Sequence, residues 1–380
     1  MSRYVVIGGG IVGASAAYHL AKRGAETVLV DRRDVGHATA AGAGIISAGG
    51  TSHVDDAYFA LAKPAIAYYP ELVAALGDLG QTNTGYDVVG ELYLAETDEQ
   101  AAELDNVYAT IAARRDAGVP NIGQLSWMDQ QQARDAFPAI GTVVRAIHFD
   151  EAARVDGRLM REALVAGAEH HGARVVVGDA ELILDGDRVI GVQVDGERIE
   201  ADGVVIATGA WTNALIAPLG GSLPVAPQKG QIVHITLGET DTSRWPILTW
   251  FGDQYILTFG PNRVVAGATR ETGSGFDTRL TPGGVQHVLD TALRIAPGLA
   301  NGTLHEVRIG LRPFSADGLP FVGRFPGHDE VVVVTGHGPS GLTMGPYSGK
   351  VGAELLLGEE PLLDLRPYAV SRALGAPAAD

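Results

Sequence analysis

The sequence predicts an α/β fold with two domains: a Rossmann-like nucleotide-binding domain and a second domain built on a large mixed or antiparallel sheet. Three observations support this prediction. The chain begins with a strand, a glycine-rich turn and a helix. Apolar runs typical of buried parallel strands recur at 174–177, 203–207 and 331–334. Between 231 and 269 the pattern changes to alternating, aromatic-bearing segments typical of antiparallel strands.

The first 31 residues contain the parts of a dinucleotide-binding unit in order. The apolar run Tyr4–Ile7 predicts a buried strand, and residues 14–23 predict a helix that Gly24 ends. Between them lies a G-x-G-x-x-G motif, and a second apolar run, 27–30, follows the helix. A tight turn that binds nothing is the alternative, but the ordered set of parts favours dinucleotide binding.

Each residue of the motif has a physical role. Gly8 permits the tight turn, Gly10 lets the backbone approach a pyrophosphate, and Gly13 lets the helix pack against the strand. Ile11 and Val12 lie at the start of the helix, where backbone amides and the positive end of the helix dipole face phosphate groups.

Two charged residues end the second strand. Asp31 is placed to accept hydrogen bonds from a ribose diol. Arg32 could contact the 2′-phosphate of an NADP-type cofactor, or it could belong to a solvated charge pair. Because Asp31 would repel a 2′-phosphate, we favour the charge pair.

Composition limits the class of protein. A length of 380 residues suits two domains, and the formal charge of −17 argues against a nucleic-acid partner. The absence of cysteine excludes disulfides, thiolate metal sites and a cysteinyl link to a cofactor, and we expect no metal site. The first strand begins near Arg3, which leaves no room for a targeting peptide, and no apolar run is long enough to cross a membrane. We therefore expect a soluble, cytoplasmic protein.

The remaining elements predict how the two domains divide the chain. We expect a helix at 56–77 interrupted by Pro64 and Pro70, then strands within 85–95, helices at 98–117, 126–137 and 155–171, a hairpin at 182–194, and helices at 284–295 and 341–357. The return of buried parallel strands after 174 predicts a discontinuous nucleotide-binding domain. Its segments are 1–84, 146–222 and 312–380, and the segments of the second domain are 85–145 and 223–311.

Two further segments are predicted to lie against a flat ligand. The run of small residues at 37–47 is too apolar for a flexible linker, and it includes Ala38, Thr39, Ala43, Gly44 and Ile46. The segment Gly336–Gly341 also matches G-x-G-x-x-G after a buried strand. We reject a second dinucleotide site there because no strand ending in an acid follows, and we expect this helix start to face the same cofactor.

Together these motifs resemble the D-amino-acid oxidase/glycine oxidase family of FAD-dependent amine oxidoreductases. The resemblance covers nearly the whole chain. It rests on 8–31, 38–46, Ala207–Trp211, Lys229–Gln231, Gly310–Pro313, Asp317–Pro320 and 336–341. It implies an FAD domain made of three separated stretches and a substrate domain whose sheet covers the flavin.

The resemblance also implies which residues bind FAD. In order from the ADP half towards the ring, these are Gly10, Gly13 and Asp31; Val176 by backbone bonds to adenine; Thr208, Gly209 and Trp211; Thr39, Ala43, Gly44 and Ile46; and Gly338, Pro339, Ser340, Gly341, Leu342 and Thr343, with Arg312 beside the ring.

Two residues are implied to bind the substrate carboxylate. Arg312 stands in the Gly310–Pro313 motif, and a planar guanidinium pairs bidentately with a carboxylate. A buried structural ion pair is the alternative. Tyr255 matches a second carboxylate ligand of the glycine-oxidase branch, and an ordinary strand aromatic is its alternative.

The chain departs from its relatives at two positions. Glycine oxidase has an arginine where this chain has Pro339, which alters the rim of the site. Sarcosine oxidases use a lysine near the position of Thr343 and a cysteinyl flavin link, and this chain has neither. We therefore expect non-covalent FAD.

The implied reaction is oxidation of the C–N bond of a small amino acid or secondary amine, of the D-amino acid, glycine or imino acid type. Hydride transfer to flavin N5 gives an imine, and oxygen or another acceptor reoxidises the flavin. An NAD(P)-dependent dehydrogenase and a non-catalytic flavin-binding protein are the alternatives. The exact substrate and a homo-oligomeric state are left open.

Overall fold

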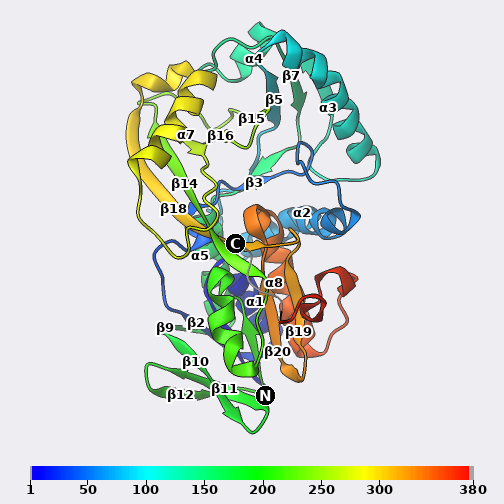
Figure 1. Ribbon diagram of the computed structural model, residues 1–380, viewed down its shortest axis with the longest axis vertical. Helices are drawn as coiled ribbons and strands as arrows, with labels where there is room; N and C mark the ends of the chain where they lie inside the picture. The colour runs from blue at the N-terminus through cyan, green and yellow to red at the C-terminus, as the bar shows by residue number, and fades with distance from the viewer. Residues whose placement is uncertain (1, 376–380) are drawn as a thin grey trace.

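A computed structural model, which describes residues 2–375, places two large sheets in the two halves of an elongated molecule (Figure 1). The lower sheet in this view has six strands in the order β19-β20-β13-β1-β2-β9. Their bounds are β1 Arg3–Ile7, β2 Glu26–Asp31, β9 Arg174–Val177, β13 Gly203–Ile206, β19 Phe321–Phe325 and β20 His328–Thr335. All neighbours are parallel except β19, which runs antiparallel to β20.

The strands of this sheet are apolar throughout because both faces are covered. Val6 and Leu29 lie in the core formed with α1 (Ile11–Lys22), α2 (Asp56–Gly77), α5 (Gly157–His170) and α8 (Gly341–Leu357). Val5 and Val28 face the opposite way. They pack with a small sheet of three strands, β10 Ala180–Asp185, β11 Arg188–Val194 and β12 Glu197–Glu200. This alternation confirms the predicted Rossmann-like fold.

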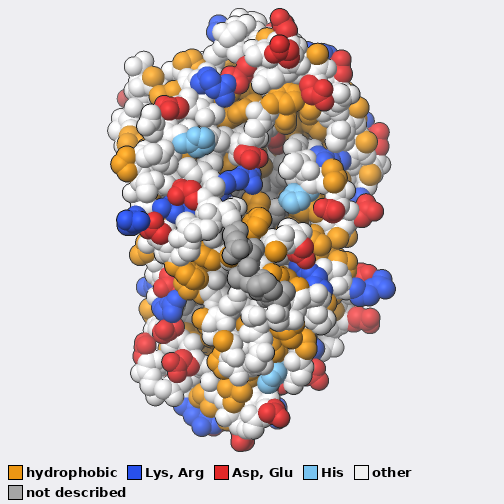
Figure 2. Space-filling model, viewed as in Figure 1, with side chains coloured by type: hydrophobic (Ala, Val, Ile, Leu, Met, Phe, Trp, Pro, Cys, Tyr) orange, Lys and Arg blue, Asp and Glu red, His pale blue; other side chains and the backbone are white. Residues whose placement is uncertain are grey.

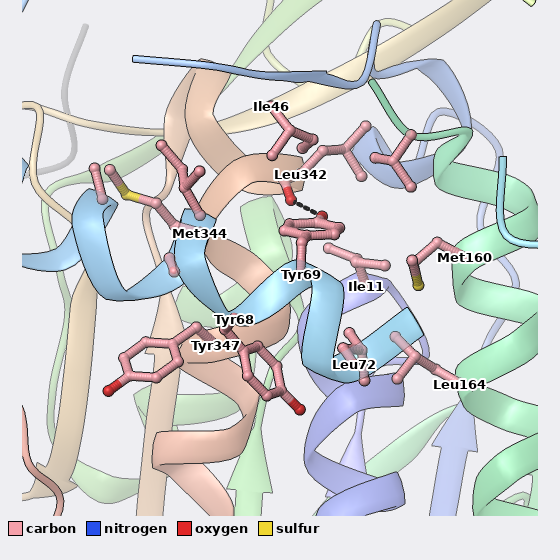
Figure 3. Packing of buried hydrophobic residues seen from close by; sticks show 14 of the residues in the cluster. Ile11, Ile46, Tyr68, Tyr69, Leu72, Met160, Leu164, Leu342, Met344 and Tyr347 are labelled. Carbon is pink, nitrogen blue, oxygen red and sulfur yellow. Dashed lines mark hydrogen bonds between the residues drawn. The ribbon is translucent and has the colours of Figure 1, made fainter. Parts of the chain in front are cut away.

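The helical side of this core is shown in Figure 3. Tyr69 of α2 is fully buried and donates a hydrogen bond to the backbone carbonyl of Leu342 in α8. The expectation that Pro64 and Pro70 interrupt the helix is wrong, because α2 continues through both. Packing of this helix against α8 and α5 compensates for the backbone hydrogen bonds that the prolines cannot donate.

The upper sheet has eight strands in the order β18-β14-β17-β16-β15-β5-β7-β6. Their bounds are β5 Glu91–Ala95, β6 Leu125–Met128, β7 Arg145–Phe149, β14 Val225–Thr236, β15 Ile247–Trp250, β16 Tyr255–Phe259, β17 Arg263–Gly267 and β18 Thr303–Ser315. Only β15 and β5 pair in parallel, so the sheet is mixed, as predicted. The helices α3 (Asp98–Asp116), α4 (Gln130–Ala136) and α7 (Pro282–Ile295) pack against it.

Shorter elements connect the two sheets. A second small sheet contains β3 Ile45–Ile46, β8 Ala153–Arg154 and β4 Asp87–Val88. The remaining helices are α6 Thr212–Ile216 and the 3₁₀ turns η1 Ala38–Ala41, η2 Gly209–Trp211, η3 Ala217–Leu219, η4 Pro297–Asn301, η5 Gly338–Ser340, η6 Arg366–Tyr368 and η7 Val370–Arg372.

The single helix expected at 126–137 is wrong in its first four residues. Residues up to Met128 continue strand β6, and α4 begins only at Gln130. Asp129 caps α4 in a capping box with Gln132. Trp127 stacks on Tyr108 of α3, with ring centres 4.8 Å apart, which favours the extended strand.

The proposed division into two discontinuous domains remains a proposal. Two of its limits fall inside strands of the eight-stranded sheet: β7 runs across 145/146 and β18 across 311/312. Residues 1 and 376–380 of the first domain lie outside the described part of the chain.

On the face shown in Figure 2, acidic and basic side chains are interspersed. No helix within residues 2–375 is both long and apolar enough to span a bilayer.

Candidate functional site

A cavity of about 640 Å³ extends from the glycine-rich turn after β1 to the inner face of the eight-stranded sheet. Most of the predicted site residues line it: Gly8, Gly10, Ile11, Val12, Asp31, Arg32, Ala38, Thr39, Ala43, Gly44, Thr208, Gly209, Trp211, Tyr255, Arg312 and all six residues from Gly338 to Thr343. The fold therefore brings together residues that lie more than 300 positions apart in the sequence.

Three predicted cofactor residues do not line the cavity. Gly13 packs closely against the turn. A methyl group on residue 13 would lie only 1.8 Å from the carbonyl oxygen of Gly8, so no larger residue fits there. Ile46 is fully buried in the core. Val176 lies within β9, and the wall is instead formed by residues 178–180 just beyond that strand.

The turn after β1 is built for close approach of a ligand to the backbone. Gly8 adopts a φ of 98°, and α1 begins after Gly10 without a side-chain cap. The backbone amide of Ile11 donates to the Thr39 hydroxyl, 2.9 Å away, which fixes the small-residue run against the helix start. The remaining amides of this helix start border the cavity and are suited to a phosphate.

Asp31 lies at the same end of the cavity as the glycine-rich turn, and its carboxylate is next to Gly9. A methyl group on residue 9 would lie 2.2 Å from Asp31 Oδ2. The Arg33 amide donates to Oδ1 (2.8 Å), and Arg161 of α5 contacts Oδ2 (3.2 Å) and donates to the Gly9 carbonyl (2.5 Å). Asp31 is thus held in place beside the cavity, as a ribose diol requires. The role of Arg161 was missed because nothing local to α5 marks it.

Arg32 points to acidic partners rather than to a phosphate site. It pairs with Asp34 (2.8 Å) and Asp179 (3.1 Å) at the rim. The structure therefore has the charge pair that the sequence favoured.

The start of α8 forms another part of the wall. The Thr343 hydroxyl donates to the Ile45 carbonyl (3.0 Å), which joins α8 to the small-residue run. His337 is buried, its Nε2 lies 2.9 Å from the Ser348 hydroxyl, and burial lowers its pKa to about 4. His337 is therefore neutral at neutral pH. After α8 the described chain continues into η6 rather than a strand, as the rejection of a second dinucleotide site expected.

Arg312 and Tyr255 meet at the sheet end of the cavity. Arg312 Nη1 donates to the Thr269 carbonyl (3.1 Å), and the guanidinium lies over Gly230. Burial lowers the pKa of Arg312, and the charge of Arg270 acts in the same direction. Burial raises the pKa of Tyr255, while its contact with Arg312 opposes that shift. Both side chains line the cavity, so the guanidinium is available to an anion.

Sequence reasoning missed several residues of this end. Arg270 lines the cavity three residues beyond the end of β17, and its side chain is 44% exposed, with Asp253 3.7 Å away. Thr249 also lines it, beside buried Glu91. Arg114 of α3 donates to the carbonyls of residues 49, 51 and 53, which fixes a loop along the wall. Sheet register and helix packing bring these residues to the cavity wall, and no local sequence motif predicts their position.

The lining fits FAD in its chemistry. The phosphate-suited start of α1 and the anchored Asp31 lie at one end, and small residues from the 38–46 run form a smooth wall towards the start of α8. In residues 2–375 no cluster of three His, Asp or Glu side chains could hold a metal ion. The chain has no cysteine for a thioether link to the flavin.

Comparisons with known proteins agree with this fit. Residues 3–355 match the family model described as FAD dependent oxidoreductase. The chain is 40% identical to the oxidoreductase YurR of Bacillus subtilis, covering 98% of this chain and 100% of the relative. It is 32% identical to a glycine oxidase of Pseudomonas aeruginosa, covering 97% and 98% of the two chains.

A solved structure is similar along nearly the whole chain. The iminodiacetate oxidase of Chelativorans sp. BNC1 superposes with a TM-score of 0.93 at 39% identity, covering 97% of this chain and 98% of that one. The motifs, the cavity and these matches lead to one conclusion: the chain belongs to the DAO family of FAD-dependent oxidoreductases.

Proposed function

We propose that this FAD-dependent oxidoreductase oxidises the C–N bond of a small secondary amine that carries two carboxylates, of the iminodiacetate type. The observation that carries the proposal is the pair of cations, Arg312 and Arg270, on one cavity wall. Family membership already disfavours the NAD(P)-dependent and non-catalytic alternatives.

Arg312 supports binding of the first carboxylate. Its guanidinium is fixed by the Thr269 carbonyl and by contact with Gly230, so its orientation is set before substrate arrives. The neighbouring Tyr255 hydroxyl can donate a further hydrogen bond to the same carboxylate. Such a fixed clamp orients the substrate for reaction.

Arg270 supports binding of the second carboxylate. Burial is the main cause of the lowered pKa of Arg312, and repulsion from the positive charge of Arg270 acts in the same direction. A dianionic substrate relieves this repulsion better than glycine, which has one carboxylate. The similar protein from Chelativorans sp. BNC1 is named for oxidation of iminodiacetate.

When bound, FAD would supply the acceptor for a hydride from the carbon next to the amine nitrogen. The protein's own groups would orient the substrate, and two features near the start of α8 would favour negative charge on the flavin. His337 is uncharged, and the start of α8 presents its positive dipole end, which favours negative charge nearby. We propose that the cofactor is held without a covalent bond and that molecular oxygen is the acceptor, which the oxidase names of the relatives support.

Product analysis tests the substrate class. The purified holoenzyme is given glycine, N-methylglycine or iminodiacetate under air, and oxygen uptake and products are followed. We expect iminodiacetate to have the highest kcat/KM and to give glycine and glyoxylate after imine hydrolysis. Faster turnover of glycine than of iminodiacetate would contradict the two-carboxylate proposal.

A further inference from the structure

Glu91, the first residue of β5, places a carboxyl group directly behind the cavity wall. It is 2% exposed. Its Oε1 accepts a hydrogen bond from the Thr249 hydroxyl at 2.6 Å, and Oε2 has no hydrogen-bond partner within residues 2–375. No lysine or arginine of the described chain forms an ion pair with it. Burying a carboxyl group with one unpartnered oxygen costs folding free energy, which suggests that Glu91 is placed there for a function.

Thr249 connects this carboxyl with the substrate end of the cavity. In the sheet, Thr249 lies opposite Tyr93 of β5 on one side and opposite Tyr255 of β16 on the other. All three side chains line the cavity, and Tyr255 contacts Arg312. Directly opposed residues on neighbouring strands have Cβ atoms about 5 Å apart. The Thr249 hydroxyl therefore lies in the same row as the carboxylate-binding groups.

The surroundings of Glu91 allow it to change protonation state near neutral pH. Burial raises the pKa of Glu91 to about 7, although the hydrogen bond from Thr249 and the nearby Ser47 hydroxyl partly oppose the shift. On its own strand, the charge of Glu91 adds to the raised pKa of Tyr93.

The other elements packed nearby bring two titratable groups. His148 of β7 lies beside Gly90, and burial lowers its pKa. Arg114 of α3 is bound to the carbonyls of residues 49 and 51, in the loop that passes beside Glu91. Neither makes an ion pair with the Glu91 carboxylate in the described chain.

We propose that Thr249 binds the amine nitrogen of the substrate and that Glu91, as a positioning residue, decides which way the Thr249 hydroxyl points. This inference rests on the proposed function. Ionised Glu91 can only accept a hydrogen bond, so the Thr249 proton points towards Glu91 and its oxygen lone pairs face the cavity. Those lone pairs accept hydrogen bonds from a substrate ammonium group.

Protonation of Glu91 reverses this polarity. A neutral carboxyl can donate to Thr249, and the Thr249 proton is then free to point into the cavity, where it opposes an N–H donor. Amine binding therefore favours ionised Glu91, and by linkage Glu91 loses protons when an amine ligand binds.

The test uses holoenzyme and two ligands that cannot be oxidised. 2-Aminoisobutyrate has an amine but no hydrogen on its α-carbon, and isobutyrate is its counterpart without the amine. The dissociation constant of each is measured from the flavin absorbance change between about pH 5.5 and 8.5, across the titration of a group near 7. Calorimetry in buffers of different ionisation enthalpy gives the number of protons released on binding.

We expect the wild-type dissociation constant for 2-aminoisobutyrate to rise by up to about tenfold per pH unit below neutrality. We also expect release of about half a proton on binding near pH 7. Isobutyrate shows neither effect. Glu91→Gln and Thr249→Val lose both effects, whereas Thr249→Ser keeps them because it retains the hydroxyl. Flavin content of each variant checks that it is folded.

Three results would overturn the inference: an unchanged pH dependence in Glu91→Gln, unchanged proton release in Thr249→Val, or the same pH dependence with isobutyrate. Failure of the proposed function looks different. In that case neither ligand perturbs the wild-type flavin and no amino or imino acid bleaches it, which removes the basis of this inference as well.

Discussion

The guanidinium of Arg312 lies against the backbone of Gly230 on the neighbouring strand, so closely that a methyl group on residue 230 would be 2.5 Å from Nη1 and 2.6 Å from Cζ. The backbone of the Lys229–Gln231 segment thus forms a flat surface against which the carboxylate-binding arginine packs. Glycine is needed at position 230 because the guanidinium occupies the space that a side chain would take.

Gly230→Ala tests this relationship. The added methyl group has to displace the guanidinium, and a shift of about 1 Å at a positioning group can cost about 100-fold in rate. We expect kcat/KM to fall by about that factor with flavin content unchanged. Gly283→Ala in α7 is the control, since a methyl group there meets nothing within 4 Å. Wild-type kinetics in Gly230→Ala would show that Arg312 is not held by this contact.

Arg270→Gln separates the two carboxylate contacts. We expect kcat/KM for iminodiacetate to fall about 10- to 100-fold, the value of a charge-assisted hydrogen bond of about 1.5–3 kcal/mol. Glycine, which uses Arg312 alone, should change far less. Steady-state kinetics on both substrates measures the difference, and equal losses on the two would argue that Arg270 acts on the fold or on the field of the whole cavity.

Gly9→Ala tests the cofactor end. Its methyl group would lie 2.2 Å from Asp31 Oδ2, so Asp31 has to move away from its bonds with Arg33 and Arg161. We expect the FAD dissociation constant to rise at least tenfold in reconstitution titrations of apoprotein. Gly77→Ala, at the end of α2 with open space around it, should bind FAD as the wild type does. Equal affinity in the two variants would exclude Asp31 from FAD binding.

Asp156 and Arg263 form an ion pair that predicts acid sensitivity. Asp156 is 5% exposed and also caps α5. Burial alone would raise its pKa, but the bonds from Arg263 and two backbone amides outweigh burial and lower the pKa below its ordinary value. Because the folded-state pKa is lowered, the stabilisation is present above about pH 4 and is lost as the pH falls through the folded-state value.

Asp156→Asn keeps a capping oxygen but leaves Arg263 without its charge partner. We expect the free energy of unfolding at pH 7 to fall by about 3 kcal/mol, as for a broken buried pair. The difference from wild type should shrink as the pH falls below about 4. Urea unfolding at several pH values measures it. Asp116→Asn, which removes an exposed pair with Arg115, should cost less than about 1 kcal/mol. A pH-independent loss in Asp156→Asn would attribute its role to packing or capping alone.

The sequence was most informative where function requires an unusual local pattern. The glycines of the first turn, Asp31 and the 38–46 run could be placed because close backbone approach and buried parallel strands leave local signatures. Arg312 was found only through the motif that the family shares.

Other parts of the site depend on contacts between distant segments. Arg161, Arg270 and the Glu91–Thr249 pair reach the cavity through helix packing and strand register, which a single sequence does not encode locally. The same reason explains the errors at Pro64 and Pro70: tertiary packing of α2 overrides the local preference against proline.

The most direct test of the account is the anaerobic visible spectrum of purified protein before and after addition of iminodiacetate, beside an Arg312→Met variant. We predict an oxidised-flavin spectrum that iminodiacetate bleaches in wild type, and the same initial spectrum with bleaching slowed at least 100-fold in the variant. A colourless protein that FAD cannot reconstitute, or equal bleaching of wild type and Arg312→Met, would contradict it.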